Sequence, residues 1–483
     1  MNASAPAEKN FVAPFEGRLP YKWLAMITAA SATLVATVTI SIVNISLPSI
    51  AQGFGASIAT VQWVLVIYPL ITVSMMLAVG YLGDVWGRKR IFTAGSVIFA
   101  VGSFLCGVAQ DPWQLIAFRV VQAAGGAMVV ANSAAIVTAA VPAAERGKSL
   151  GIVSTVAGIG LSVGPALGGI LVDTAGWRWV FFVAVPLSVL TAALAALYLR
   201  DRPRSISQAQ PFDVAGAVLL FISLTSFLMA LGEAQENGWS SARLAGLAAV
   251  FLISAVAFVL IEQRAALPTV DLALLGDRFF AATATTGLLA YMAMFTAMFL
   301  MPFYLTGTAG YSSAQAGTLL TAIPLAMALT ATISGWLSDR FGPRWLCAAG
   351  MGLCTTSFLL LAQLGHTAAY GDIAVRLLVL GLGVGIFMSP NNSAMMGCVP
   401  AARLGMASAL VATVRHLGVA LGVAVGGGVF TARLATYATP GASAGTGIFD
   451  PAASVGAFRD AYLVLALLCA IGILTSLVRG PKG

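Results

Sequence analysis

Charge is scarce in this sequence: Asp, Glu, Lys and Arg make up 9% of its 483 residues, while 59% are hydrophobic. Soluble globular chains carry roughly 25% charged residues, so the composition excludes a soluble protein. Histidine is scarcer still, with two residues in the whole chain. No nucleophile–base constellation or metal-ligand cluster is recognisable, so an enzyme is the least favoured class, and we expect no metal and no cofactor.

Cysteine gives no sign of a disulfide framework. The five cysteines are odd in number and lie in or at the ends of apolar runs. The first 20 residues are polar and lack the apolar core of a signal peptide, so we expect the first long apolar run to direct membrane insertion.

What the sequence does have is long apolar runs. A spanning helix needs about 20 mostly apolar residues, and we count fourteen such runs. The fold expected is therefore an all-α polytopic membrane protein. The predicted spans are about 24–47, 59–83, 89–108, 113–140, 147–172, 177–199, 212–232, 242–262, 279–304, 314–338, 344–364, 371–397, 404–431 and 457–478.

The net charge of +8 could indicate a nucleic-acid partner, but its distribution argues against one. Most Lys and Arg residues fall in alternate loops on one side of the predicted membrane. Basic loops mark the cytoplasmic side, and an even number of spans puts both termini there. We expect a multi-pass protein of the inner (cytoplasmic) membrane, in contact with the lipid bilayer and with no nucleic-acid partner.

The sequence contains an internal repeat. Residues 80–90 (GYLGDVWGRKR) and 335–344 (GWLSDRFGPR) each form a short turn after a second helix. Two such copies imply parallel halves related by an axis along the membrane normal. The copies lie too far apart in the sequence for two six-helix halves that adjoin directly, so we expect an insertion between the halves. The predicted division is a cytoplasmic tail (1–23), an N-terminal six-helix bundle (24–199), a linker with an inserted transmembrane hairpin (200–278) and a C-terminal six-helix bundle (279–483).

These turns are candidates for a cytoplasmic gate. Gly87 is needed because two helices meet there with almost no loop. Asp84 can accept hydrogen bonds from a helix N-terminus or pair with an Arg. Such a contact exists only while the cytoplasmic ends are together, so it can latch the outward-facing state. The alternative is a loop whose bases only set topology. The gate candidates are Gly80, Asp84, Gly87, Arg88, Lys89, Asp339, Arg340 and Gly342.

A glycine-rich span is the second candidate element. The stretch 151–169 (GIVSTVAGIGLSVGPALGG) has no ionisable residue. Glycines four apart line one face of a helix and allow close approach of a neighbouring backbone, and a mid-span Pro should kink the helix. The alternative is ordinary small-residue packing. The residues that form the pattern are Gly151, Gly160, Gly164, Pro165, Gly168 and Gly169.

This glycine pattern resembles the fifth-helix antiporter motif of the drug-exporting branches of the major facilitator superfamily. Residues 80–89 resemble the loop signature of that superfamily, with Val85 where Arg is usual. Residues 115–125 resemble its fourth-helix signature, which contains Arg119 and Gln122.

Other segments resemble the fourteen-span drug:proton antiporter branch. Residues 44–48 and 177–186 resemble its first- and sixth-helix signatures, and Gln62 and Tyr68 match its second span. The resemblance implies a major facilitator fold of two six-helix bundles plus an inserted hairpin. It also implies alternating access by a monomer, with export of small amphiphilic drugs or natural products driven by the proton gradient.

The span-one signature departs from this branch at Thr39, where an Asp is common. No acidic residue lies near a predicted midplane, and the deep ionisable candidates are basic. His416 lies about eleven residues into its span, roughly 17 Å along it, beside Arg415. An ionisable residue at depth is a functional hypothesis, although Arg119 could instead bind backbone carbonyls, and His416 could be a satisfied core residue. The predicted coupling residues are Arg119, Gln122, Arg415 and His416.

The predicted substrate cavity is apolar and rich in Met, which suits varied ligands because a thioether repacks easily; such residues also simply fill helix contacts. Without a deep carboxylate the cavity favours neutral or anionic amphiphiles over quaternary cations. The cavity candidates are Asn44, Gln62, Tyr68, Tyr291, Phe295, Met298, Asn391 and Asn392.

Two other functions fit the same composition. The first is a lipid or envelope-precursor exporter on the same scaffold. The second is a membrane sensor or scaffold that transports nothing, although two intact gate turns argue against it.

Overall fold

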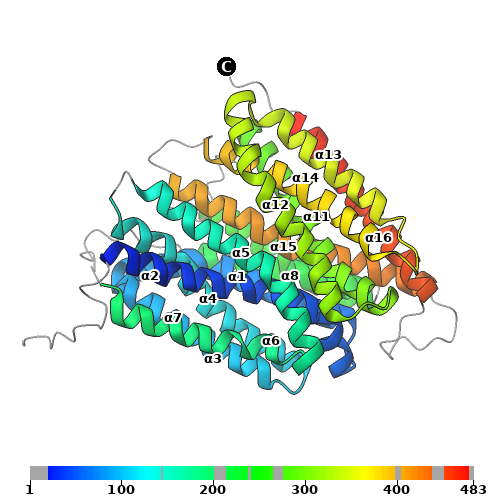
Figure 1. Cartoon of the computed structure of the whole chain (residues 1–483), viewed down its shortest axis with the longest axis horizontal. Helices are drawn as coiled ribbons and strands as arrows, with labels where there is room; N and C mark the ends of the chain where they lie inside the picture. Colours follow the sequence, from blue (N-terminus) through cyan, green and yellow to red (C-terminus); the bar gives the residue numbers. More distant parts are fainter. Residues whose placement is uncertain are drawn as a thin grey trace, which may run out of the picture.

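We describe the fold from a computed structural model, which describes residues 20–142, 145–200, 214–237, 241–264, 276–397, 404–437 and 451–477. Over these residues the chain is helical and forms no strand (Figure 1). The helices of the first half are α1 (Tyr21–Phe54), α2 (Ile58–Trp86), α3 (Arg88–Val108), α4 (Pro112–Ala140), α5 (Arg146–Ala175), α6 (Trp179–Phe182) and α7 (Ala184–Tyr198). These are followed by α8 (Val214–Asn237), α9 (Ala242–Glu262), α11 (Arg278–Phe303), the π-helix η3 (Tyr304–Thr308), α12 (Ser313–Phe341), α13 (Pro343–Leu361), α14 (Tyr370–Gly397), α15 (Leu404–Tyr437) and α16 (Pro451–Leu477).

The predicted all-α polytopic fold is confirmed. Within the described residues, thirteen helices are long and apolar enough to cross a membrane, with α6 and α7 acting together as one span. The helix α8 adds a shorter apolar stretch, Val218–Ala230. Each of the fourteen predicted spans therefore corresponds to a helical segment.

Two predicted spans differ from the structure at a proline. The predicted first span ends at residue 47, but α1 continues through Pro48 and ends at Phe54, and Gly55 after it adopts a left-handed conformation (φ 60°). The sixth span is divided at Val183. Pro186 lacks the N–H that a continuous helix would direct back to Phe182, which explains the break.

The helices pack as two bundles whose contacts repeat. In the N-terminal bundle α1 packs on α5, and α4 packs on α2 and α3; in the C-terminal bundle α11 packs on α15, and α14 packs on α12 and α13. The contacts between the bundles also form an equivalent pair, because α5 packs on α12 while α15 packs on α2. This repetition is what parallel halves produce.

The α8–α9 hairpin lies beside one of these seams. The helix α8 packs on α9 and also contacts α2 and α15, one helix from each bundle. The linker segments 201–213 and 265–275 on either side of the hairpin, like residues 1–19 of the predicted tail, fall outside the described residues.

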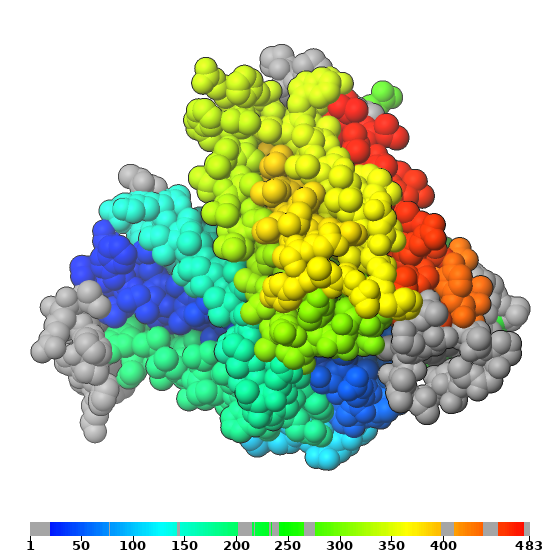
Figure 2. Space-filling model, turned by 45° about the vertical axis from the view of Figure 1, so that its right-hand side comes forward, coloured from blue at the N-terminus to red at the C-terminus, as the bar shows by residue number. Residues whose placement is uncertain are grey.

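The two bundles are close at one end and apart at the other (Figure 1). They meet where α5 ends and α12 begins, which is the predicted outer end. Figure 2 shows the teal surface of α5 against the yellow-green surface of α12. At the predicted cytoplasmic end, every ion pair between described residues lies within one bundle.

Candidate functional site

The glycine face of α5 is the contact surface that the spacing predicts. A side chain added at Gly160, Gly164 or Gly168 would meet atoms of α1. One at Gly169 would meet the backbone of Ser313 on α12. The same helix therefore packs α1 within its own bundle and α12 across the seam.

Two further observations complete the description of this helix. Gly151 has nothing within 4 Å of an added Cβ, so this first glycine of the pattern makes no close contact. On α12, Gly317 lies against the Pro165 carbonyl. Among the glycines of α5, the close contacts begin at Gly160 and continue to Gly169, toward the predicted outer end of the helix.

A carboxylate joins the bundles at that outer end. Asp173 of α5 accepts hydrogen bonds from the backbone N–H groups of Ser313 (3.1 Å) and Ala314 (2.8 Å), the first two residues of α12. The Ser312 hydroxyl accepts the next one, from Gln315. The first N–H groups of a helix have no partner within the helix, so Asp173 supplies a cap from the opposite bundle.

Sequence reasoning missed Asp173. Acidic side chains were judged by their depth in a span, and Asp173 lies near a helix end, where a carboxylate is unremarkable. Its role depends on the N-terminus of α12, which is distant in sequence.

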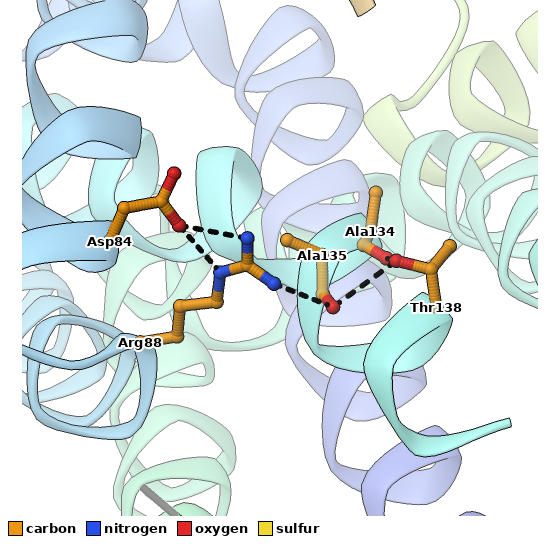
Figure 3. Close-up of polar contacts among 5 residues, drawn as sticks. All are labelled: Asp84, Arg88, Ala134, Ala135 and Thr138. Atoms are coloured by element: carbon orange, nitrogen blue, oxygen red, sulfur yellow. Dashed lines mark hydrogen bonds and ion pairs between the residues drawn. The ribbon is translucent and has the colours of Figure 1, made fainter. Parts of the chain in front are cut away.

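Both gate turns have the predicted geometry. Gly87 and Gly342 have positive φ angles of 101° and 81° and join consecutive helices directly. Asp84 accepts hydrogen bonds from Arg88 at 2.9 and 2.8 Å, and Arg88 donates to the Ala135 carbonyl of α4 at 3.2 Å (Figure 3).

The Asp84 contacts thus stay inside the N-terminal bundle. They do not reach across to the C-terminal bundle in this conformation, in which the predicted cytoplasmic ends of the bundles are apart (Figure 1). In the second turn Asp339 and Arg340 are exposed, and the Arg340 guanidinium lies 5.7 Å from the Phe341 ring centroid. Gly80 has open space around it, and Lys89 is half-buried.

Arg119 is held in the middle of the N-terminal bundle. It is 1% exposed and donates to the Val64 carbonyl of α2 at 3.0 Å and to Gln122 at 2.6 Å. Gln122 donates to the Ser103 hydroxyl of α3 at 2.7 Å. The guanidinium lies 4.8 Å from the Tyr68 ring centroid. This is the arrangement expected of an Arg that joins helices of its own bundle.

Three cavity candidates of the N-terminal half are packed rather than open. Tyr68 lies under Arg119, Asn44 donates to the Ile40 carbonyl within α1, and Gln62 lies against Gly427 at the α2–α15 seam. The Gln62 side-chain oxygen is buried and accepts no hydrogen bond from a described residue. These side chains therefore belong to bundle interiors and to the seam.

Polar candidates of the C-terminal half come together on three helices. The Tyr291 hydroxyl of α11 lies near the Asn392 side chain of α14 and in the field of Arg415 on α15. Asn391 lies against Gly287, one turn from Tyr291. On α11, Met298 is buried and Phe295 is half-buried.

His416 faces the seam between the bundles. Its ring is 8% exposed, and its Nε2 lies 3.5 Å from an Arg415 nitrogen. It borders a small crevice with residues of α2 and α8, among them Pro69 and Leu224. The inserted hairpin, the N-terminal bundle and the C-terminal bundle therefore all meet at this side chain.

Comparisons with known proteins agree with this architecture. A family model described as Major Facilitator Superfamily matches residues 29–423 and 283–482. A bacterial homologue of the human lysosomal transporter Spinster, solved in an inward-facing and occupied conformation, has a TM-score of 0.70 and 16% identity and covers 96% of this chain and 97% of that one. This likeness concerns the fold alone.

Curated relatives are similar over most of their length. The riboflavin transporter RibZ of Clostridioides difficile (strain 630) is 34% identical over 94% of this chain and 96% of its own. The multidrug resistance protein Stp of Mycobacterium tuberculosis (strain CDC 1551 / Oshkosh) is 31% identical over 83% and 74%. The puromycin resistance protein pur8 of Streptomyces alboniger is 30% identical over 95% and 90%. The resemblance to drug exporters is confirmed, and the chain belongs to the major facilitator superfamily.

Proposed function

We propose that this protein is a secondary active transporter that exports small amphiphilic compounds by proton antiport. The family and the relatives named for multidrug and puromycin resistance support export. The proposal includes a monomer in the inner membrane with both termini in the cytoplasm. The distribution of basic loops supports this orientation. Transport, and not catalysis, is the proposed activity.

The observation that carries the proposal is the asymmetry of the seam. At the outer end α5 and α12 interlock through Gly169 and Gly317, and Asp173 caps α12. At the cytoplasmic end the gate turn is bonded within its own bundle. Bundles that are joined at the predicted outer end and apart at the predicted cytoplasmic end are consistent with the state in which an exporter that works by alternating access would load its cargo.

His416 is the proposed proton site. Thr39, which stands where the branch commonly has an Asp, is buried and donates to the Val35 carbonyl. His is the side chain whose charge changes most readily near neutral pH. A change of charge beside Arg415, at a seam of both bundles and the hairpin, would bias which ends of the bundles stay together.

The test is transport in proteoliposomes that contain the purified chain. A panel that includes puromycin, rhodamine 123 and riboflavin is presented with and without an imposed pH gradient. We expect at least one compound to accumulate against its gradient only when the pH gradient is present. Accumulation that ignores the pH gradient would reject proton coupling, and absence of flux for every compound would favour a sensor.

Riboflavin is the second candidate substrate, because the relative named as a riboflavin transporter matches nearly the full chain. The same vesicles decide between the two. Riboflavin flux that exceeds the flux of the drug panel would assign a vitamin transporter instead of a drug exporter.

A further inference from the structure

Arg415 forms no ion pair with a described residue, unlike several other arginines of the chain. Arg88, Arg376 and Arg433 each pair with a carboxylate of their own bundle. No described carboxylate pairs with Arg415, and its nearest polar partner is His416, itself a possible cation. A charged side chain within a span is costly near the membrane centre, so it should face protein or water.

The packing of α15 shows which way Arg415 points. Gly418 and Gly422, three and seven residues later, lie against α11. His416 borders α2, as does Gly427. Residues three and seven apart share a helix face, while adjacent residues differ by about 100°. Arg415 therefore lies between the α11 side and the α2 side of its helix, toward the cleft between the bundles, and its side chain is exposed.

Tyr291 and Asn392 approach the same point from two other helices. Gly418 lies against the Cβ of Tyr291, which places the tyrosine one turn from Arg415. One turn earlier on α11, Gly287 meets Asn391 of α14 and Val414 of α15. The Asn392 side chain and the Arg415 charge both act on the Tyr291 hydroxyl, which places them near it. Three helices thus bring a guanidinium, a phenol and an amide together.

This set is rich in donors. A guanidinium has five N–H donors and no acceptor, an amide adds two, and a phenol adds one. Arg is especially suited to planar oxygen anions, which it binds through two parallel hydrogen bonds. A cationic ligand would meet repulsion here. On the next turn of α11, the half-buried Phe295 offers an apolar surface on the side of the helix that holds Tyr291, while Met298, one turn further, is buried in the core.

We propose that Arg415, Tyr291 and Asn392 form a binding subsite for the carboxylate or other oxygen anion of an amphiphilic substrate, with Phe295 beside its apolar part. This subsite deepens the proposed function and rests on it, because it assigns a class of cargo to the cleft.

The test is equilibrium binding in detergent, which needs no flux and so can fail or succeed independently of transport. The probes are dansylglycine and its neutral amide, dansylglycinamide, which differ only at the carboxylate. Dansyl fluorescence is titrated with wild-type chain and with Arg415→Gln, Arg415→Lys and Arg433→Gln. Arg433→Gln is the matched control, since it removes the same charge from the same helix, at a site where Arg433 pairs with Asp460.

We expect wild type and Arg433→Gln to prefer the acid. Arg415→Gln should lose about ten- to hundredfold in affinity for the acid and almost none for the amide, and Arg415→Lys should retain part of the preference. Equal affinity for both probes in wild type, binding of neither, or a preference for the acid that survives Arg415→Gln in a folded chain would overturn the proposal.

Discussion

Arg119 illustrates how one buried side chain can join three helices. It binds a carbonyl of α2 directly and reaches α3 through Gln122 and Ser103. Two interpretations of this residue, as a structural tie and as a coupling group, predict different outcomes for the same conservative substitution.

We expect Arg119→Lys to destabilise the protein. Lysine cannot reproduce the two donors that reach Val64 and Gln122, and a buried acceptor left without a partner costs about 1–3 kcal/mol. The unfolding free energy should therefore fall by about 2 kcal/mol, seen as a lower melting temperature in detergent. A normal melting temperature with a lost response to the pH gradient would instead assign Arg119 to coupling.

His416 is the proposed proton site, so its substitution tests proton coupling. Glutamine keeps a similar size and polar ends but cannot gain a charge. We expect His416→Gln to abolish pH-driven accumulation while the melting temperature and substrate binding stay close to wild type. His366→Gln, which changes the only other histidine, is the control and should transport normally. Wild-type rates and pH profile in His416→Gln would remove this residue from the mechanism.

At the scale of the helix, the α5 glycines provide an internal comparison. Gly164 has Ser41 and the Ile42 backbone where a side chain would go, while Gly151, in the same motif, has open space. Forcing atoms into a packed contact costs about 1–3 kcal/mol. We expect Gly164→Val to lower the melting temperature clearly and Gly151→Val to leave it within a degree or two. Equal effects in the two variants would show that the glycine spacing does not mark a contact with α1.

The same helices show what sequence can and cannot predict. The spans were predictable because a membrane span must be apolar along its length and charged at its ends. The effect of the two prolines was harder to predict, because α1 continues through Pro48 while a helix break precedes Pro186. The contact faces of Gly160, Gly164 and Gly168 followed from helical spacing.

Contacts between elements that are distant in the chain could not be predicted from the sequence. The position of Tyr68 under Arg119, the burial of Gln62 against Gly427 and the cap from Asp173 to α12 all depend on which helices become neighbours. A single sequence states how polar a side chain is but not which other helix it meets, so depth along a span was the available guide to a site.

At the scale of the whole molecule, we expect the seam between α5 and α12 to govern the conformational equilibrium. The bundles are each held together by their own contacts, so what changes in alternating access is the seam between them. Asp173 is a polar link that joins the bundles across it, from one helix end to the first N–H groups of another. Its strength therefore contributes to how much of the population stays closed outside.

We expect Asp173→Ala to shift that population toward the outward-open state. Asp173 is exposed, so its two hydrogen bonds are weakened by solvent, and the ratio of states should change by about three- to tenfold. Spin labels at Trp86→Cys and Trp336→Cys, exposed positions near the predicted cytoplasmic ends of α2 and α12, report this ratio in a chain whose native cysteines are replaced by alanine. Their distance distribution, measured by double electron–electron resonance, should gain a shorter component.

Asp372→Ala is the control for this measurement, because Asp372 pairs with Arg376 within α14 and does not bridge the seam. An unchanged distribution in Asp173→Ala, or the same shift in Asp372→Ala, would show that the glycine packing of α5 against α12 holds the outer end closed without the carboxylate.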